Sequence, residues 1–286
     1  MSILARALGW ASTGEPRERH KLLLINHIIL LLLVAFALLP LLVLAFNAVK
    51  TNAEIGLNPL GFPQSLHLEN FANAWEQGEF ATTAGNSVIL VVATVALELV
   101  LAGMAAYGLA RRKPPGVDGF MFYMLVASTI PIWLYIVPLF FMWRTLGLLN
   151  TRLGMVLIYT ALNAPLAIFL LRSYMISLSN EIEDAARVDG ANEFQVLTQI
   201  VLPLTWPGFL TVGLAVWSEF QIALVFTSDP DMFPVTTSFF KFTDRFSRDW
   251  SLTSAGAVLM IFPVLLLFLA LQRRFIEGLT QGGLKA

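Results

Sequence analysis

The sequence predicts an all-α integral membrane protein with six transmembrane helices and both termini in the cytoplasm. The chain has 286 residues, of which 57% are hydrophobic and only 13% are charged, whereas soluble domains carry about 25% charged residues. Six apolar stretches reach the roughly 20 residues that a helix needs to cross a bilayer core. The Lys and Arg residues are also divided unevenly between the segments that connect these stretches.

The first apolar stretch follows a polar, basic N-terminal segment, residues 1–21. It is longer than the about 7–15 apolar residues of a secretory signal and lacks a persuasive cleavage site, so we interpret it as a retained span. Residues 22–275 then form the six-helix membrane domain, followed by a cytoplasmic tail, 276–286. The predicted spans are 22–46, 85–110, 119–143, 153–175, 204–228 and 254–275, and the segments between them are 47–84, 111–118, 144–152, 176–203 and 229–253.

The orientation follows from the positive-inside rule. With the N-terminus inside, twelve of the 18 Lys and Arg residues fall in inner segments or at the inner ends of spans. The short loop RRKPPG, residues 111–116, is the strongest single indication. Segments 47–84, 144–152 and 229–253 are then external, and segment 176–203 is cytoplasmic.

The two long external segments differ in character. Residues 47–84 contain a proline-punctuated stretch and then a predicted short amphipathic helix with Leu68, Phe71 and Trp75 on its apolar face. Residues 229–253 are rich in aromatic and charged residues. Such a composition suits contact with a partner protein, and equally an aromatic belt at the membrane interface.

The cytoplasmic segment 176–203 reads as a helix–turn–helix. Residues 181–188 (EIEDAARV) are good helix formers with acidic residues early, which favours a helix N-terminus. Asp189-Gly190 indicates a turn. A second helix follows with Ala191, Phe194, Leu197 and Val201 on one face, and Pro203 and Pro207 bracket the return to the membrane. The segment either docks into a partner's groove or packs on the protein's own spans.

The stretch DAARVDGANEFQVLTQIVLP, residues 184–203, resembles the EAA-loop signature of binding-protein-dependent ABC importer permeases, EAA-x2-DGA-x5-F-x2-I-x-LP. Asp184 replaces the Glu and Leu197 replaces the Phe of that pattern, and the rest matches without gaps. AAYGLARRKPPG, LGLLNTRLGMVLIYTALNAPLAIFLLRSY and the tail RRFIEGLTQGGLKA are similar to the maltose-type carbohydrate branch. The resemblance implies that the residues coupling this chain to an ATPase are Asp184, Ala185, Ala186, Asp189, Gly190, Ala191, Phe194, Leu197 and Pro203.

The resemblance implies a membrane subunit of a sugar importer in the plasma membrane. It implies a second permease of related fold, two copies of a cytosolic ABC ATPase gripping the EAA-loop coupling helix, and an external solute-binding protein. ATP and Mg would then bind in the ATPase, and this chain would bind no cofactor directly and hydrolyse no ATP. The C-terminal GLTQGGLKA either reaches toward the ATPase interface or is disordered, as glycine-rich termini often are.

Polar residues within predicted spans are candidates for the substrate pathway, because ionisable groups in a membrane are costly. Glu98 lies in the second span, Asn163 in the fourth, and Trp217, Glu219 and Gln221 in the fifth. An aromatic ring beside hydrogen-bonding groups suits a sugar face. The alternative for each of these residues is a contact between spans, and Ala102 and Ala106 indicate helix packing.

Other functions find little support in the sequence. The chain has no Cys, its three His residues lack metal-ligand spacing, and no P-loop is present. A net charge of −1 without a basic stripe argues against nucleic-acid binding. A permease for another solute, such as a polyamine, an amino acid or phosphate, stays open because the EAA loop is shared. A secondary transporter would need inverted repeats that are not evident, and a pure scaffold is disfavoured by the polar groups in the spans.

Overall fold

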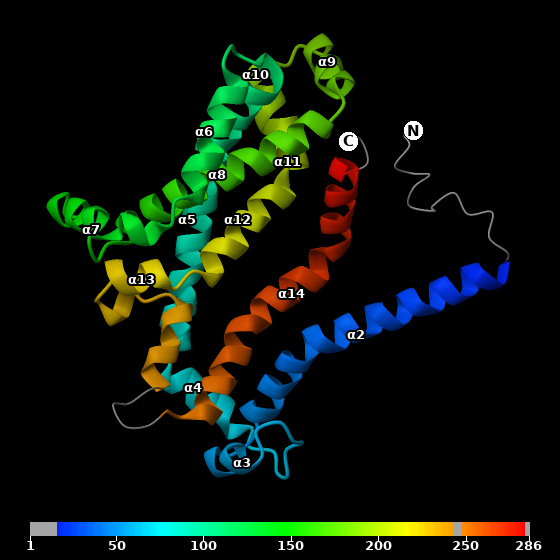
Figure 1. Cartoon of the computed structure of the whole chain (residues 1–286). Helices are drawn as coiled ribbons and strands as arrows, with labels where there is room; N and C mark the ends of the chain where they lie inside the picture. Colours follow the sequence, from blue (N-terminus) through cyan, green and yellow to red (C-terminus); the bar gives the residue numbers. More distant parts are fainter. Residues whose placement is uncertain (1–15, 243–247, 284–286) are drawn as a thin grey trace.

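The computed structural model describes residues 16–242 and 248–283, which form an elongated helical bundle (Figure 1). Its helices are α2 (Pro16–Ala48), α3 (Asn52–Leu57), α4 (Glu69–Gln77), α5 (Phe80–Tyr107), α6 (Val117–Thr129), α7 (Ile136–Thr145), α8 (Arg152–Ser177), α9 (Asn180–Val188), α10 (Glu193–Gln195), α11 (Leu202–Leu204), α12 (Trp206–Ser218), α13 (Gln221–Phe226) and α14 (Trp250–Gly283). Short π-helices are η1 (Gly108–Arg112) and η3 (Val196–Val201), and 3₁₀ turns are η2 (Ile132–Leu134), η4 (Pro230–Met232) and η5 (Val235–Phe242).

The bundle has two ends that matter for function. Helices α3 and α4 lie at one end, and α9 lies at the other, beside α10 and the start of α6 (Figure 1). We call these the α4 end and the α9 end. Helices α5 and α14 run between these ends, α8 and α12 lie in the half nearer α9 (Figure 1), and α5 packs against both α8 and α12. The predicted coupling loop therefore lies at one end of the bundle. Segment 47–84, which is predicted to be external, lies at the other end.

Four described helices are long and apolar enough to cross a membrane: Leu24–Ala48, Phe80–Arg112, Arg152–Ser177 and Trp250–Ala270. A fifth candidate is the pair Glu193–Leu204 and Trp206–Ser218, which bends by 65°. These segments agree with four of the six predicted spans. The fifth predicted span, 204–228, is broken into shorter helices. The third predicted span, 119–143, is also interrupted.

The prediction of a continuous helix over residues 119–143 is wrong. Helix α6 ends at Thr129, and α7 then runs in a different direction (Figure 1). Pro131 explains the break, since it lacks an N–H donor and forces the preceding residue out of the helical region. Ile130 accordingly has an extended backbone, with φ −73° and ψ 115°.

The prediction of a continuous helix over 204–228 is also wrong. Thr205 separates α11 from α12, and Pro207 stands in the first turn of α12, where its missing N–H costs nothing. Glu219 then ends α12 with an extended backbone, and α13 covers only Gln221–Phe226. The apolar composition of this stretch signals burial in a membrane but does not report the breaks in the helix.

The core lies where α5, α8 and α12 meet. Its most deeply buried side chains include Tyr159, Leu171 and Val212. Ala102 and Ala106 are buried, as predicted for packing positions. Gly103 lets α5 approach closely, because a Cβ atom added there would lie 2.9 Å from a methyl of Leu202.

The α4 end is held by side chains that bind backbone groups. Lys50, fully buried, donates from Nζ to the carbonyl oxygens of Asn58 at 3.0 Å and Gly61 at 2.6 Å. Asn70 on α4 donates to the carbonyls of Ala48 and Lys50. The predicted short helix of segment 47–84 is present as α4, but the predicted apolar face is wrong, because Leu68 and Trp75 are exposed while Asn70 and Ala74 are the buried residues. Residues 243–247 of the other long segment lie outside the described residues.

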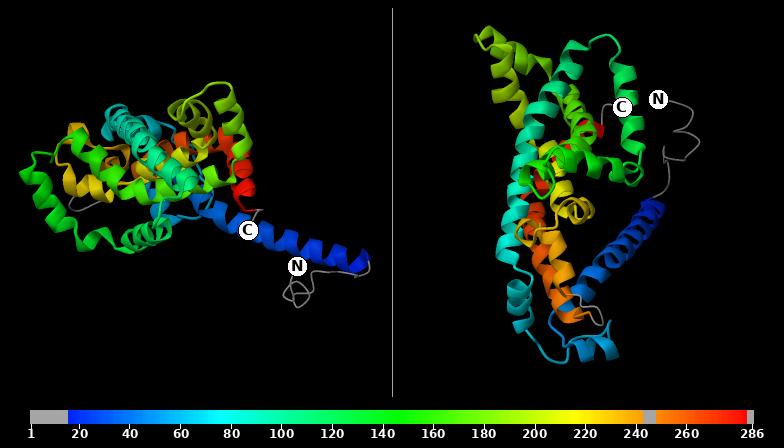
Figure 2. Two further views of the ribbon diagram at one scale, coloured as in Figure 1. Left: turned by 90° about the horizontal axis from the view of Figure 1, so that it is seen from above. Right: turned by 90° about the vertical axis from the view of Figure 1, so that its left-hand side faces the viewer.

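Helix α2 leaves the bundle. It contacts α14 near the α4 end and then diverges from the other helices (Figure 2). Every described side chain from Leu24 to Leu42 is exposed. Helix α14 continues to Gly283, so the predicted tail is helical at residues 276–283, while residues 1–15 and 284–286 lie outside the described part of the chain.

Candidate functional site

The first half of the predicted coupling loop is helix α9, and local sequence explains both of its ends. The Ser179 side chain caps the N-terminus by accepting the Glu181 N–H at 3.2 Å. At the C-terminus, the Gly190 N–H donates to the Arg187 carbonyl at 3.1 Å and the Ala191 N–H donates to the Ala186 carbonyl at 2.9 Å. This Schellman motif needs a left-handed residue after the cap, and Gly190 supplies it with φ +90°. The predicted turn at Asp189-Gly190 is confirmed.

The second half begins with a capping box and then changes helix type. The Asn192 side chain accepts the Gln195 N–H at 2.9 Å, and the Gln195 side chain accepts the Asn192 N–H at 2.8 Å. Only Glu193–Gln195 is α-helical before the π-helix η3. This change rotates the predicted apolar face, so that Leu197 and Val201 are buried while Phe194 is 66% exposed. The prediction of one apolar face containing all of these residues is therefore wrong.

A cluster of charged residues joins α9 to the end of α5. The Glu183 carboxylate, whose side chain is 3% exposed, accepts a hydrogen bond from Arg111 Nε at 2.7 Å. Arg187 donates to Glu183 at 3.3 Å and to Glu193 at 2.8 Å. The Tyr107 hydroxyl lies 3.2 Å from Glu183 and 3.0 Å from Glu193. We call Tyr107, Arg111, Glu183, Arg187 and Glu193 the Glu183 network.

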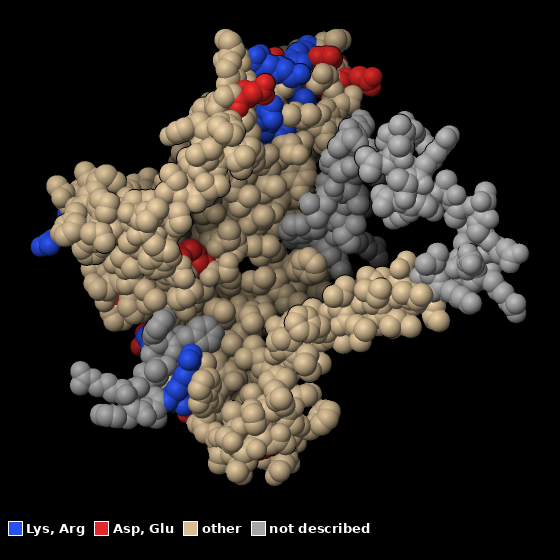
Figure 3. Space-filling view, viewed as in Figure 1, with Lys and Arg blue, Asp and Glu red and all other residues tan. Residues whose placement is uncertain are grey.

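The Glu183 network fixes the position of α9 relative to a membrane helix. The hydrogen bond from Arg187 to Glu193 raises the pKa of Arg187 above the ordinary value for arginine. Arg187 is therefore cationic at every relevant pH. Charged groups gather at this α9 end of the molecule (Figure 3). A network of ion pairs that shares partners is more rigid than isolated surface pairs. The network therefore ties α9 to the end of α5 in this structure.

Sequence reasoning missed this network. It used Arg111 only as an indicator of orientation and left Glu183 and Glu193 unassigned. The spacing of Glu183 and Arg187, four residues apart, favours an ion pair within a helix, but their link to α5 joins residues 72 positions apart. Only the tertiary structure brings those residues together.

The predicted coupling residues divide into an exposed set and a set that is buried or half-buried. Asp184, Ala185, Asp189, Gly190, Phe194 and Pro203 are exposed, whereas Ala186 and Ala191 are half-buried and Leu197 is buried. Val188, which the prediction omitted, is 88% exposed beside this set. Asp184 is the one predicted carboxylate with a described ion pair, to Arg187 at 2.7 Å. The exposed set forms a surface that carries both charge and apolar groups.

Glu98 lies inside the bundle. Its side chain is fully buried, and neither carboxylate oxygen has a hydrogen-bond partner among the described residues. Thr94, one turn away on α5, is also fully buried with its hydroxyl unpaired within the described part of the chain. In this conformation Glu98 does not line an open passage, and its role in the substrate pathway stays a prediction.

The remaining pathway candidates do not converge on one cavity. Trp217 donates from its indole N–H to the Met260 carbonyl at 3.3 Å and lines an apolar groove between α5, α12 and α14. Asn163 donates to the Tyr159 carbonyl at 2.8 Å on its own helix. Gln221 is exposed. Trp217 and Asn163 thus make contacts within the bundle, and a role in the pathway stays a prediction for these candidates.

Glu219 stabilises the break between α12 and α13. Its carboxylate accepts the N–H groups of Gln221 at 2.9 Å and Ile222 at 3.1 Å, and the Tyr159 hydroxyl at 3.3 Å. These bonds satisfy the first donors of α13 as a helix cap does. Glu219 therefore holds α13 at an angle to α12 and ties both to α8.

We expect Glu219→Ala to destabilise the protein by about 2 kcal/mol, because it removes a helix cap and leaves the buried Tyr159 hydroxyl without an acceptor. Thermal unfolding of the detergent-purified chain measures this loss. Gln221→Ala, which removes only an exposed side chain, is the control and should change the free energy of unfolding by less than about 0.5 kcal/mol. An unchanged melting temperature for Glu219→Ala, with a raised KM for uptake, would instead identify Glu219 as a substrate ligand.

The bundle with its projecting α9 is the fold of an ABC importer permease. A solved structure described as a bacterial ABC transporter involved in the import of the acidic polysaccharide alginate aligns with a TM-score of 0.74 at 22% identity, covering 92% of this chain and 100% of that chain. The chain belongs to the family of binding-protein-dependent transport system inner membrane components, which matches residues 98–281. It is therefore a multi-pass protein of the plasma membrane.

Several named relatives match over most of the chain. The diacetylchitobiose uptake system permease protein NgcG of Streptomyces coelicolor is 34% identical, over 90% of this chain and 87% of its own length. The sulfoquinovosyl glycerol transport system permease protein SmoH of Agrobacterium fabrum is 31% identical over the full length of both. The arabinooligosaccharides transport system permease protein AraQ of Halalkalibacterium halodurans is 33% identical, over 92% and 96%.

Proposed function

We propose that this chain is the membrane-spanning permease subunit of an ATP-driven, binding-protein-dependent importer of sugars, with a di- or oligosaccharide as substrate. The observation that carries the proposal is the match, over nearly the whole chain, to permeases named for diacetylchitobiose, sulfoquinovosyl glycerol and arabinooligosaccharides. The chain forms half of the translocation pathway. Selectivity rests mainly with the external binding protein.

The assembly we propose contains a second permease of related fold, two copies of a cytosolic ABC ATPase and the external solute-binding protein. The divergence of α2 supports a second permease, since its side chains from Leu24 to Leu42 are covered by no other described part of this chain (Figure 2). The ATPase binds ATP and Mg, and this chain binds no cofactor. Both termini and the α9 end face the cytoplasm, with α6 and α7 as a broken third span in a six-span topology.

The exposed residues of α9, the following turn and α10 form the docking surface for the ATPase. Val188, Phe194 and Ile182 present exposed apolar area, 88%, 66% and 47% respectively, beside the carboxylates of Asp184 and Asp189. A short helix with apolar anchors fits a groove in a partner. ATP-driven closure of the ATPase pair moves α9, and the Glu183 network passes that movement to α5. One ligand-driven equilibrium thus biases another through differential contacts.

Uptake by proteoliposomes tests the proposal. The chain is co-expressed with a candidate binding protein, second permease and ATPase from the same genome, and the complex is reconstituted. We expect uptake of labelled diacetylchitobiose or an arabinooligosaccharide that requires ATP and the binding protein. Spermidine, glutamine and phosphate are the solutes for the alternative importer classes, and uptake of one of these in place of sugars would replace the proposed substrate class. A chain that purifies alone and transports with an ion gradient would overturn the proposal.

A further inference from the structure

We propose that a basic cavity at the α9 end binds the phosphate headgroup of an anionic phospholipid. The cavity has a volume of about 570 Å³ and lies between η1, the last turns of α8 and the segment that joins α8 to α9. It is separate from the exposed set that we assign to the ATPase. The assignment to a membrane leaflet rests on the orientation given under the proposed function.

The lining of this cavity is strongly cationic. Arg111, Lys113 and Arg172 contribute to it, and its described lining residues include no Asp or Glu. Arg111 is partly neutralised by its ion pair with Glu183. The positive charges of Lys113 and Arg172 are matched by no ion pair among the described residues, so the cavity attracts an anion.

Arg172 carries a hydrogen-bond donor for which no described residue supplies an acceptor. Its Nε atom is buried and has no hydrogen-bond partner in the described part of the chain. A charged donor that is hidden from water is unfavourable unless an acceptor reaches it. The oxygens of a phosphate group match the planar donors of a guanidinium well. Arg172 lines the cavity and is half-buried, so its guanidinium is placed to meet a phosphate there.

The surroundings favour a lipid over a soluble anion. The cavity lies where two membrane helices end, α5 through η1 and α8, and Ile176 at its edge is 51% exposed. An apolar side chain beside a cationic pocket suits a headgroup with an acyl chain attached. Basic pockets between transmembrane helices on the cytoplasmic side are recognised sites for anionic headgroups, and that leaflet carries most anionic lipid.

A lipid bound here also bears on coupling. Ser179, which caps α9, and Asn180, its first residue, belong to the cavity lining. A headgroup in the cavity would hold the start of α9 at the membrane surface while the Glu183 network holds its middle. The lipid would thus fix a second point of the coupling helix.

Native mass spectrometry of the full-length chain in detergent micelles tests the site. The chain is titrated with palmitoyl-oleoyl phosphatidylglycerol and, separately, with phosphatidylcholine, and retained lipid is counted. We expect phosphatidylglycerol to be retained in preference to phosphatidylcholine. Arg172→Gln and Lys113→Gln should each weaken retention by about tenfold. Thermal unfolding in parallel verifies that the variants are folded.

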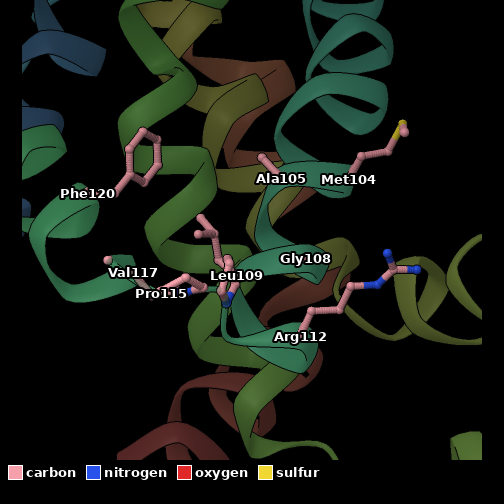
Figure 4. Close-up of a pocket in the computed structure, with 10 residues that line it drawn as sticks. Met104, Ala105, Gly108, Leu109, Arg112, Pro115, Val117 and Phe120 are labelled. Carbon is pink, nitrogen blue, oxygen red and sulfur yellow. The ribbon is translucent and has the colours of Figure 1, made fainter.

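Arg112→Gln is the matched control. Arg112 precedes Lys113 on the same turn, yet it lies at the edge of a different pocket of about 430 Å³, whose lining includes Leu109, Val117 and Phe120 (Figure 4). This variant removes the same charge from the same side of the membrane, and retention should change by less than about twofold. An equal loss for Arg112→Gln would overturn the proposal, because it would indicate diffuse surface charge.

Two further arms identify the source of the phosphate. Inorganic phosphate in excess should not displace phosphatidylglycerol; complete displacement would assign the cavity to free phosphate and overturn the lipid proposal. Retention is also measured with the ATPase bound, and loss of lipid on ATPase binding would show that the partner covers the cavity, which again overturns it. Because the readout is lipid retention, a failure here is distinct from a failure of sugar uptake.

Discussion

Replacement of Gly190 by valine is expected to leave the chain folded in the membrane and to lower transport-coupled ATP hydrolysis by at least about tenfold. The cause lies in the backbone. Gly190 has φ +90°, where a β-branched residue is strained, while no heavy atom lies within 4 Å of the position a Cβ would take. Valine would therefore break the Schellman turn without a steric clash, and the surface of α9 would be redirected away from the ATPase.

Two variants isolate this effect. Gly190→Asn keeps access to the left-handed region and should retain more activity than valine. Gly119→Val adds the same side chain in α6, where φ is not positive and space is open, and should leave coupling unchanged. ATPase activity and sugar uptake of the reconstituted complex are both measured. Normal sugar import by Gly190→Val would show that this turn does not couple the ATPase to transport.

Removal of Glu183 is expected to have the second large effect. Glu183→Ala leaves the Arg111 guanidinium, whose side chain is only 14% exposed, without its carboxylate partner. Breaking a buried pair from one side costs about 3–5 kcal/mol, and the residual exposure of Arg111 favours the lower part of that range. We expect a marked fall in the melting temperature and loss of coupled ATP hydrolysis, because α9 loses its attachment to α5.

A double-mutant cycle separates the free energy of the Glu183–Arg111 interaction from the effect of each residue alone. Glu183→Ala, Arg111→Ala and the double variant should give a coupling free energy of about 2 kcal/mol. Glu181→Ala removes an exposed carboxylate from the same helix, and its stability and activity should stay near those of the unaltered chain. Additive effects of Glu183→Ala and Arg111→Ala would show that the network does not join the two helices.

Local sequence signals predicted much of the coupling loop. Asp189-Gly190 and the acidic start of the preceding helix act within a few residues, and the structure places the turn and helix α9 where they indicate. The EAA pattern also identified the importer family, which the match over residues 98–281 confirms. The site roles of the individual residues stay predictions that the variants above test.

The two failures of continuous spans share a cause. Hydropathy averages over about 20 residues, so it located the apolar stretches but did not register Pro131 or the extended backbone at Glu219. Proline at position 131 was visible in the sequence as a helix breaker. The break at Glu219 depends on its capping of α13 and its bond to Tyr159, sixty positions away in the chain.

The sequence by itself determined that the protein is a helical membrane protein, because composition and apolar run length report directly on the solvent that surrounds each segment. It also determined the turn at Asp189-Gly190, whose bonds are local. Only the tertiary structure decided which polar residues meet. Glu183 and Arg111, Glu219 and Tyr159, and the cationic lining shared by Lys113 and Arg172 each join residues far apart in the chain. The packing of α5 against α8 and α12 brings these partners together. No local sequence pattern predicts that packing.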